Sequence, residues 1–150
     1  MIRLKTVLLA EDNPRDAELT IEALAANNLA NRVHYVRDGV EVMEYLNSTG
    51  VHNTRKSGNP AVVILDIKMP RMDGIEVLKA IRADPALKLL PVVMLTCSRN
   101  DQDLIHCYQH GANAYVVKPV KFADFVETVK HLAIFWGMIN EIPPHNCIPA

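Results

Sequence analysis

Five short apolar segments place the tightest limit on what this chain can fold into. They lie at residues 7–10, 33–36, 62–65, 92–95 and 114–117. Four of them are continuously apolar, a pattern typical of strands that are covered on both faces of a parallel sheet. The second segment, Val33-His34-Tyr35-Val36, mixes polar and apolar residues, which suits an edge strand. The sequence therefore predicts five parallel strands, with the second at an edge.

Helical patterns fill the gaps between these segments and follow the last one. The first helix begins at Asn13-Pro14, an N-cap followed by proline at the first helical position. Asp73 and Glu76 have the spacing of a capping box. Residues 122–136 carry the clearest apolar stripe, and we expect Gly137 to end that helix. This alternation predicts an α/β fold: a five-stranded parallel sheet, doubly wound as (βα)5 and flavodoxin-like, with strand order 2-1-3-4-5.

The length of 150 residues fits one domain. We expect this domain to occupy residues 1–137 and residues 138–150 to form a C-terminal extension. Pro143, Pro144 and Pro149 lie in that extension and cannot continue a helix. The polar segment 47–60 is longer than most loops of such folds.

Charge and composition exclude several classes of protein. Sixteen basic and 17 acidic residues give a formal net charge of −1, whereas a nucleic-acid-binding domain shows a basic excess. We find neither an apolar run long enough to cross a membrane nor a signal peptide, so we expect no membrane partner. Cys97, Cys107 and Cys147 are an odd count without a close pair. They fit free thiols in a reducing, cytoplasmic setting.

Polar side chains follow four of the predicted strands. They are Glu11-Asp12, Asp66, Thr96-Cys97-Ser98 and Lys118. Because ligands of such folds bind at the carboxyl ends of the strands, we expect these side chains to converge. Three carboxylates in one pocket repel one another and need compensation. Lys118 supplies one positive charge, and Mg²⁺ supplies more, since carboxylates, a carbonyl and waters suit its octahedral coordination. Such a pocket is suited to accept a phosphoryl group.

These elements resemble the response-regulator receiver domains of two-component signalling. The matching residues are Glu11-Asp12-Asn13, the D-x-x-M-P-x-M-D-G string from Asp66 to Gly74, Thr96, and Lys118-Pro119. The resemblance spans about residues 6–136. It implies a phosphorelay protein that is not an enzyme, but a phosphoacceptor that assists its own Mg²⁺-dependent phosphorylation and dephosphorylation.

The resemblance also implies a role for each matching residue. Asp66 is similar to the phosphoacceptor, and Asp12 to a direct Mg²⁺ ligand. Glu11 would act beside it through water, and the backbone carbonyl of Lys68 would be a further protein ligand.

Three residues after the last two strand segments complete the implied machinery. Thr96 is similar to the hydroxyl switch residue, and Tyr115 to the aromatic residue that changes rotamer with it. A tyrosine in a strand is also often a packing residue, so both roles stay open for Tyr115. Lys118 is similar to the phosphate-binding lysine, and its bond to Pro119 is expected to be cis.

Softer marks point to a subgroup, the single-domain regulators that pair with cyanobacterial and bacterial phytochromes. These marks are the Asp84-Pro85 turn followed by Leu87-Lys88, the long loop before the third strand, and Phe135-Trp136 at the end of the last helix. The implied partner is a sensor histidine kinase of the phytochrome type. Only 14 residues follow Trp136, so we expect signalling by protein–protein contact.

Two further interpretations concern surfaces and metals. Phe135, Trp136, Met138 and Ile139 are too close in sequence to share one narrow helix face. They predict a homodimer through the last helix and the extension. His106, Cys107 and His110 lie on one predicted helix, and the spacing of the two histidines could hold zinc. A solvated helix face is favoured for all three because no fourth ligand is evident.

Other functions are possible on a flavodoxin-like fold. A flavin or nucleotide carrier would need a Gly/Ser/Thr-rich phosphate loop, where this chain has Glu11-Asp12-Asn13-Pro14. An aspartyl phosphatase would need a second acid at the position of Lys68. A phosphorylation-independent binding module is the remaining alternative, and the intact acidic pocket argues against it.

Overall fold

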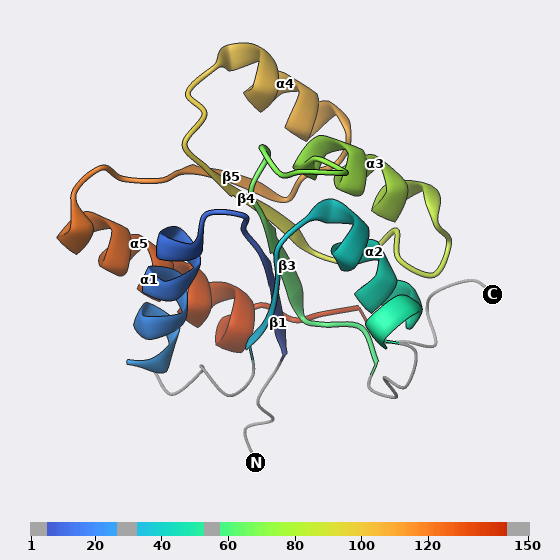
Figure 1. The fold of residues 1–150 in the computed structure, drawn as a ribbon, viewed down its shortest axis with the longest axis horizontal. Coiled ribbons are helices and arrows are strands. Elements are labelled where there is room, and N and C mark those ends of the chain that lie inside the picture. The colour runs from blue at the N-terminus through green and yellow to red at the C-terminus, as the bar shows by residue number, and fades with distance from the viewer. Residues whose placement is uncertain (1–5, 27–32, 53–57, 144–150) are drawn as a thin grey trace.

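The sheet has five parallel strands, as predicted. The computed structural model describes residues 6–26, 33–52 and 58–143. The strands are β1 (Val7–Ala10), β2 (Val33–Val36), β3 (Val62–Leu65), β4 (Val92–Thr96) and β5 (Ala114–Val117). Their order, β2-β1-β3-β4-β5, confirms the predicted doubly wound topology (Figure 1). The polar-mixed strand β2 lies at an edge because only one of its sides is paired.

Helices cover both faces of the sheet. They are α1 (Pro14–Ala25), α2 (Gly39–Asn47), α3 (Gly74–Ala83), α4 (Asp101–Gln109) and α5 (Phe122–Ile134). Helices α1 and α5 pack together on one face, and α2 and α3 lie on the other, with α4 beyond α3 (Figure 1). A short 3₁₀ turn, η2 (Gly50–His52), lies within the long polar segment. None of the helices in the described ranges combines the length and apolar character that a membrane crossing needs.

The core consists of two layers because the central strands are buried on both faces. Leu8 and Ala10 of β1 face the layer formed with α2 and α3. Val7 and Leu9 face the layer formed with α1 and α5. This explains why β1, β3 and β4 are continuously apolar in sequence.

The predicted helix starts are confirmed. Asn13 accepts hydrogen bonds from the amides of Arg15 and Asp16 and so caps α1. Asp73 and Glu76 form the predicted capping box at the start of α3. Each cap satisfies amides that the helix leaves unpaired, and it fixes where the preceding loop must end.

The end of α5 differs from the prediction. The α-helix ends at Ile134, and a π turn, η3 (Phe135–Ile139), continues past Gly137. The amide of Asn140 donates to the carbonyl of Phe135 across 2.6 Å, the wide hydrogen bond of a π turn. Glycine lowers helix stability but does not forbid the turn.

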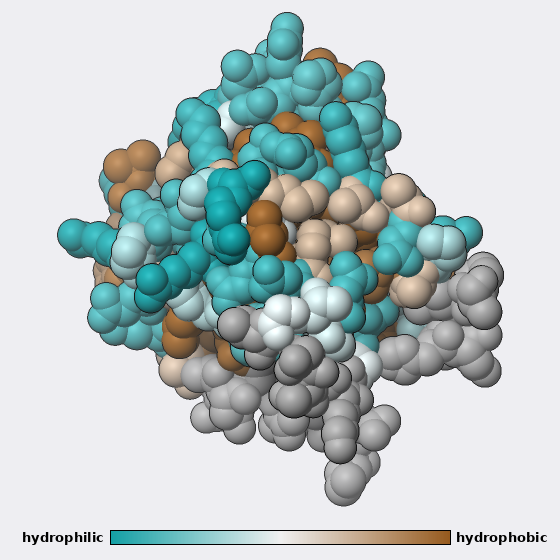
Figure 2. All heavy atoms as spheres, turned by 45° about the vertical axis from the view of Figure 1, so that its right-hand side comes forward, coloured by the Kyte–Doolittle hydropathy of each residue, from teal (hydrophilic) through white to brown (hydrophobic). Residues whose placement is uncertain are grey.

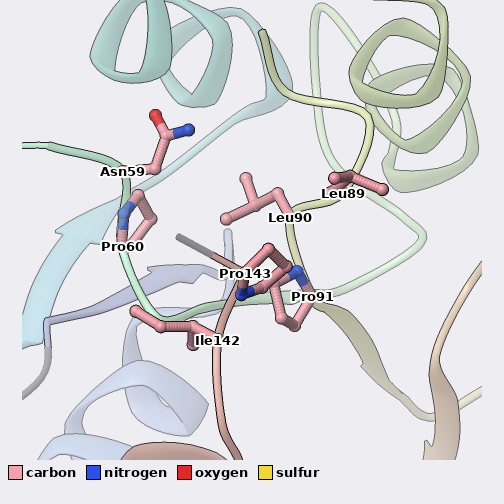
Figure 3. Close-up of a pocket in the computed structure, with 7 residues that line it drawn as sticks. All are labelled: Asn59, Pro60, Leu89, Leu90, Pro91, Ile142 and Pro143. Carbon is pink, nitrogen blue, oxygen red and sulfur yellow. The ribbon is translucent and has the colours of Figure 1, made fainter. Parts of the chain in front are cut away.

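The chain then crosses the amino ends of the strands. Figure 3 shows Ile142 and Pro143 beside Pro60, which precedes β3, and beside Pro91, which precedes β4.

Figure 2 shows the face that carries α2 and α3, where hydrophobic residues gather in a small area among hydrophilic ones.

Candidate functional site

A pocket of about 450 Å³ opens at the carboxyl ends of β1, β3, β4 and β5. Its lining residues are Asp12, Asn13, Pro14, Asp16, Asp66, Lys68, Thr96, Cys97, Ser98 and Lys118. The sheet order brings these residues together, since β1, β3, β4 and β5 are consecutive neighbours and their carboxyl ends lie at the same end of the sheet.

Three carboxylates form the acidic part of the site. Glu11, Asp12 and Asp66 each offer an oxygen within 4.8 Å of the others. Glu11 and Asp66 are buried, with 3% and 8% exposed, whereas Asp12 is exposed. Clustered carboxylate oxygens are the donors that hard divalent cations prefer, so this cluster fits a divalent metal ion.

Lys118 is buried between these acids. Its Nζ donates to Asp66 Oδ2 at 3.0 Å, to Asp16 Oδ2 at 3.0 Å, and to Glu11 Oε2. Burial alone would lower the pKa of Lys118, but the hydrogen bond and charge of Glu11, with the charge of Asp66, raise it overall. The ammonium is therefore charged at neutral pH.

Glu11 is the acid of the site whose charged form is disfavoured by its surroundings. Burial, together with the charge of Asp66, raises the pKa of Glu11 to about 7 despite the hydrogen bond from Lys118. Its other oxygen accepts from the Asn13 amide at 3.1 Å. The pocket is thus under-supplied with positive charge, which a bound cation would correct.

The phosphoacceptor candidate Asp66 is held by its own loop. Its Oδ1 accepts from the Ile67 amide at 2.7 Å, which leaves Oδ2 directed to Lys118. The Gly74 amide donates to the Ile67 carbonyl at 2.8 Å, so the start of α3 lies directly against Asp66. Lys68 is exposed and lines the pocket.

Thr96 and Tyr115 both contact the loop after β4. The Thr96 hydroxyl, almost fully buried, accepts from the Ser98 amide at 3.3 Å. The Tyr115 hydroxyl donates to the Ser98 carbonyl at 3.0 Å. Burial raises the pKa of Tyr115, so this hydroxyl stays protonated. The two candidate switch residues are therefore linked through one residue, Ser98.

Asp16 belongs to the site although the sequence did not single it out. It lies in the first turn of α1, where an acidic residue is favoured in any helix. The signal that could have found Asp16 is its position three residues after the cap Asn13. The first turn of α1 starts directly after β1, and its residues Pro14 and Asp16 line the pocket together with Asn13.

Two other expectations are wrong in the structure. The Lys118–Pro119 bond is trans, not cis; trans is the more stable isomer of most X–Pro bonds by about 0.5–1 kcal/mol. In α4 the thiol of Cys107 is fully buried rather than on a solvated face, and burial raises its pKa to about 11. His106 is exposed as expected.

The possible zinc site on α4 gains no support. Within residues 6–26, 33–52 and 58–143, the group of His, Cys, Asp and Glu side chains that could hold a metal is Glu11, Asp12 and Asp66. Cys97 and Cys107 are free thiols, and Cys147 lies outside the described residues.

Comparison with protein families gives an independent result. The family model described as the response regulator receiver domain matches residues 7–130. Response regulator Rcp1 of Synechocystis sp. is 35% identical over 132 residues, which cover 88% of this chain and 88% of Rcp1.

Solved structures show the same similarity. The phosphorylated cyanobacterial phytochrome response regulator RcpA is 37% identical and superposes with a TM-score of 0.87, covering 95% of this chain and 100% of RcpA. The Mn²⁺-bound form of Rcp1 is 34% identical with a TM-score of 0.85, covering 93% and 99%. The bacteriophytochrome response regulator RtBRR is 48% identical with a TM-score of 0.74, covering 97% and 87%.

Proposed function

The chain belongs to the response regulator receiver domain family, and we propose that it accepts a phosphoryl group on Asp66 from a sensor histidine kinase. The observation that carries this proposal is the ion pair between Lys118 Nζ and Asp66 Oδ2, 3.0 Å apart and buried at the bottom of an acidic pocket. A nucleophilic carboxylate beside a fixed ammonium is the arrangement that phosphoryl transfer needs.

In the proposed transfer, an Asp66 carboxylate oxygen attacks the phosphorus atom of a phosphohistidine on the kinase. A P–O bond forms as the P–N bond breaks, and the imidazole leaves and takes a proton from solvent. Lys118 exchanges part of its contact with Asp16 and Glu11 for a phosphoryl oxygen. The positive charge that meets the phosphoryl group is already buried in the site before the transfer, because the Lys118 ammonium is paired there with Glu11 and Asp16.

The chain's own residues fit Mg²⁺ as the cation. Asp12, Asp66 and the Lys68 carbonyl would hold it, with Glu11 acting beside them through water. When bound, Mg²⁺ neutralises charge on the transferring phosphoryl group. The Mn²⁺-bound form of the relative Rcp1 supports a divalent metal in this family.

We propose that Thr96 and Tyr115 read the phosphorylated state. Phosphorylation places an acceptor oxygen near Thr96, whose hydroxyl now contacts Ser98. A Thr96 hydroxyl that turns to the phosphate would release the Ser98 amide. The conformation of the loop at Ser98 would then change, and with it the hydrogen bond from the Tyr115 hydroxyl to the Ser98 carbonyl. The result is a population shift between two surfaces around α4, β5 and α5.

Three relatives support the choice of partner. All three, Rcp1, RcpA and RtBRR, are response regulators, and RcpA and RtBRR are named as phytochrome or bacteriophytochrome response regulators. We therefore propose a phytochrome-type histidine kinase as the phosphodonor. The free thiols of Cys97 and Cys107 support a cytoplasmic location.

The apolar end of α5 supports a homodimer. Phe135 and Ile139 are 47% and 60% exposed, and Trp136 stacks edge-on against Phe135; the side chain of Met138 lies outside the described residues. We assign residues 1–137 to the receiver domain and residues 138–150 to a C-terminal extension, of which Ile139 belongs to this surface. Light scattering at high concentration, with and without a phosphate mimic, should give the dimer mass, and Ile139→Asp should shift it to the monomer mass.

The phosphoacceptor is tested by labelling with a small phosphodonor. Asp66→Asn should abolish Mg²⁺-dependent labelling. Asp73→Asn is the matched control, because it changes a carboxylate of the same loop that caps α3 and lies outside the pocket. Persistent labelling of Asp66→Asn would refute the assignment.

A further inference from the structure

Tyr35 connects the edge strand to the acidic site. It lies on β2, where its register partner is Leu9 of β1. Its hydroxyl donates a hydrogen bond of 2.7 Å to the backbone carbonyl of Glu11. Burial raises the pKa of Tyr35, so the hydroxyl is a proton donor at neutral pH.

This hydrogen bond continues the strand pairing beyond the end of β1. The Ala10 carbonyl accepts from the amide of Asp66, the residue after β3, at 3.1 Å, and the Glu11 amide donates to the Val36 carbonyl at 3.2 Å. The carbonyl of Glu11 is the first that the sheet no longer pairs, and Tyr35 supplies its donor.

The peptide group held in this way joins Glu11 to Asp12. The side chain of Glu11 is already fixed by Lys118 and by the Asn13 amide. Asp12 is exposed, so few neighbouring atoms fix its side chain. The direction in which its carboxylate points therefore depends on the orientation of this peptide plane. A rotated plane would separate the carboxylates that now lie within 4.8 Å.

We propose that Tyr35 is a positioning residue for the divalent-cation site: its hydroxyl holds the Glu11–Asp12 peptide so that both carboxylates face Asp66. The inference rests on the proposed function, because it concerns the same cation site. It assigns Tyr35 no contact with the cation or the phosphoryl group.

The test compares Tyr35→Phe with Tyr108→Phe, in the full chain. Phenylalanine keeps the ring of Tyr35 and removes only the donor, while Tyr108 lies half-exposed on α4, away from the pocket. Mn²⁺ alone is the probe, and its dissociation constant is measured from the EPR signal of the free ion. Tyr35→Phe should raise that constant about three- to tenfold, the worth of one hydrogen bond. Tyr108→Phe should leave it unchanged.

A second measurement separates positioning from general stability. Labelling by a small phosphodonor is followed against Mg²⁺ concentration. Tyr35→Phe should raise the half-saturating Mg²⁺ concentration by the same factor, with the rate at saturating Mg²⁺ close to wild type. A purely structural role would lower the Tm of the metal-free protein and leave both metal dependences unchanged, and that result overturns the inference.

The two proposals fail in different ways. A wild-type chain that neither binds Mn²⁺ nor takes label contradicts the proposed function. A wild-type chain that does both, with Tyr35→Phe behaving identically, contradicts only the role of Tyr35.

Discussion

Lys118 holds three carboxylates around one ammonium, so its removal should be costly. Lys118→Met leaves Glu11 and Asp66 buried without their cation. We expect it to destabilise the metal-free protein by about 3–5 kcal/mol at pH 8, the usual cost of breaking a buried pair from one side. Chemical denaturation measures this loss, and Lys121→Met, at the exposed N-cap of α5, is the control.

The loss should depend on pH with a definite sign. A carboxyl group whose pKa is raised on folding stabilises the fold below its unfolded pKa and loses that advantage as pH rises through its folded pKa. Glu11 has a pKa of about 7 even beside Lys118, and the variant should raise it further. The cost of Lys118→Met should therefore shrink between pH 8 and pH 5. An equal cost at both pH values would contradict this account.

A second ion pair anchors the loop that carries Asp66. Arg71 donates to both oxygens of Asp38, at 2.8–3.0 Å, and Asp38 caps α2 through the Glu41 amide. Asp38→Asn keeps the cap but loses the pair. We expect a loss of up to about 1 kcal/mol at pH 7, since the Arg71 side chain is 57% exposed.

Acid should abolish that difference. Burial alone would raise the pKa of Asp38, but hydrogen bonds from the Glu41 amide and Arg71 lower it overall. Its contribution is therefore present above the unfolded pKa and is lost as pH falls through the folded pKa. Urea unfolding of wild type and Asp38→Asn should differ at pH 7, and the difference should narrow as the pH falls below about 4; a gap that does not narrow in acid would exclude the ion pair as its source.

The convergence of the site residues could be predicted because each one lies at the end of a strand or directly after it. Parallel strands put their carboxyl ends at one edge, so Glu11, Asp66, Thr96 and Lys118 had to meet once the topology was right. Asp16 and Tyr35 could not be found in this way. Asp16 already had a sufficient role at a helix start, and the hydroxyl of Tyr35 reaches Glu11 only through the register of β2 on β1.

At the scale of elements, two helices begin with a glycine for a steric reason. A Cβ on Gly39 of α2 would lie 2.1 Å from the Met72 carbonyl oxygen, and one on Gly74 of α3 would lie 2.2 Å from the Asp66 carbonyl oxygen. Both obstacles are backbone atoms, so the alanine variants can fit only if a loop moves. We expect Gly39→Ala and Gly74→Ala each to destabilise the fold by about 1–3 kcal/mol.

The pair distinguishes stability from function. Gly74→Ala pushes on Asp66 itself, whereas Gly39→Ala pushes on the loop six residues later. Phosphodonor labelling, measured at a temperature where circular dichroism shows both variants folded, should fall more in Gly74→Ala. Equal labelling at equal stability would mean that the start of α3 does not position Asp66.

The edge position of β2 was predictable from its residue pattern, but the faces of α4 were not. The continuously apolar runs of β1, β3 and β4 indicate central strands and the mixed run of β2 an edge strand, whereas β5 is continuously apolar and still lies at the other edge. In α4 the apolar residues Ile105 and Tyr108 are half-exposed, and Cys107 is the buried position. This helix packs near the edge strand β5, whose residues are only partly covered. A helix over such a margin needs few apolar contacts, so its apolar spacing says little about its orientation.

At the scale of the whole molecule, the carboxyl ends and the amino ends of the strands have separate roles. The carboxyl ends of the strands carry the acidic pocket, and the amino ends are covered by the segment after η3. Ile142 and Pro143 lie there against Pro60, Leu90 and Pro91 (Figure 3). Residues 142 and 143 thus contribute to the fold at the opposite end of the strands from the acidic pocket.

This separation predicts a variant that affects stability without affecting chemistry. Ile142 is 37% exposed, and Ile142→Asp would place a carboxylate against Leu90 and two proline rings. We expect a loss of about 1 kcal/mol, a Tm lower by about 2–4 °C, because part of one apolar side chain leaves its contacts. Mn²⁺ affinity and phosphodonor labelling at 25 °C should not change, since the sheet lies between. Ile139→Asp, on the 60% exposed neighbour, should leave the Tm unchanged in dilute protein. If Ile142→Asp lowers labelling while the Tm stays constant, the amino ends of the strands are coupled to the acidic pocket, and the separation of stability from chemistry is wrong.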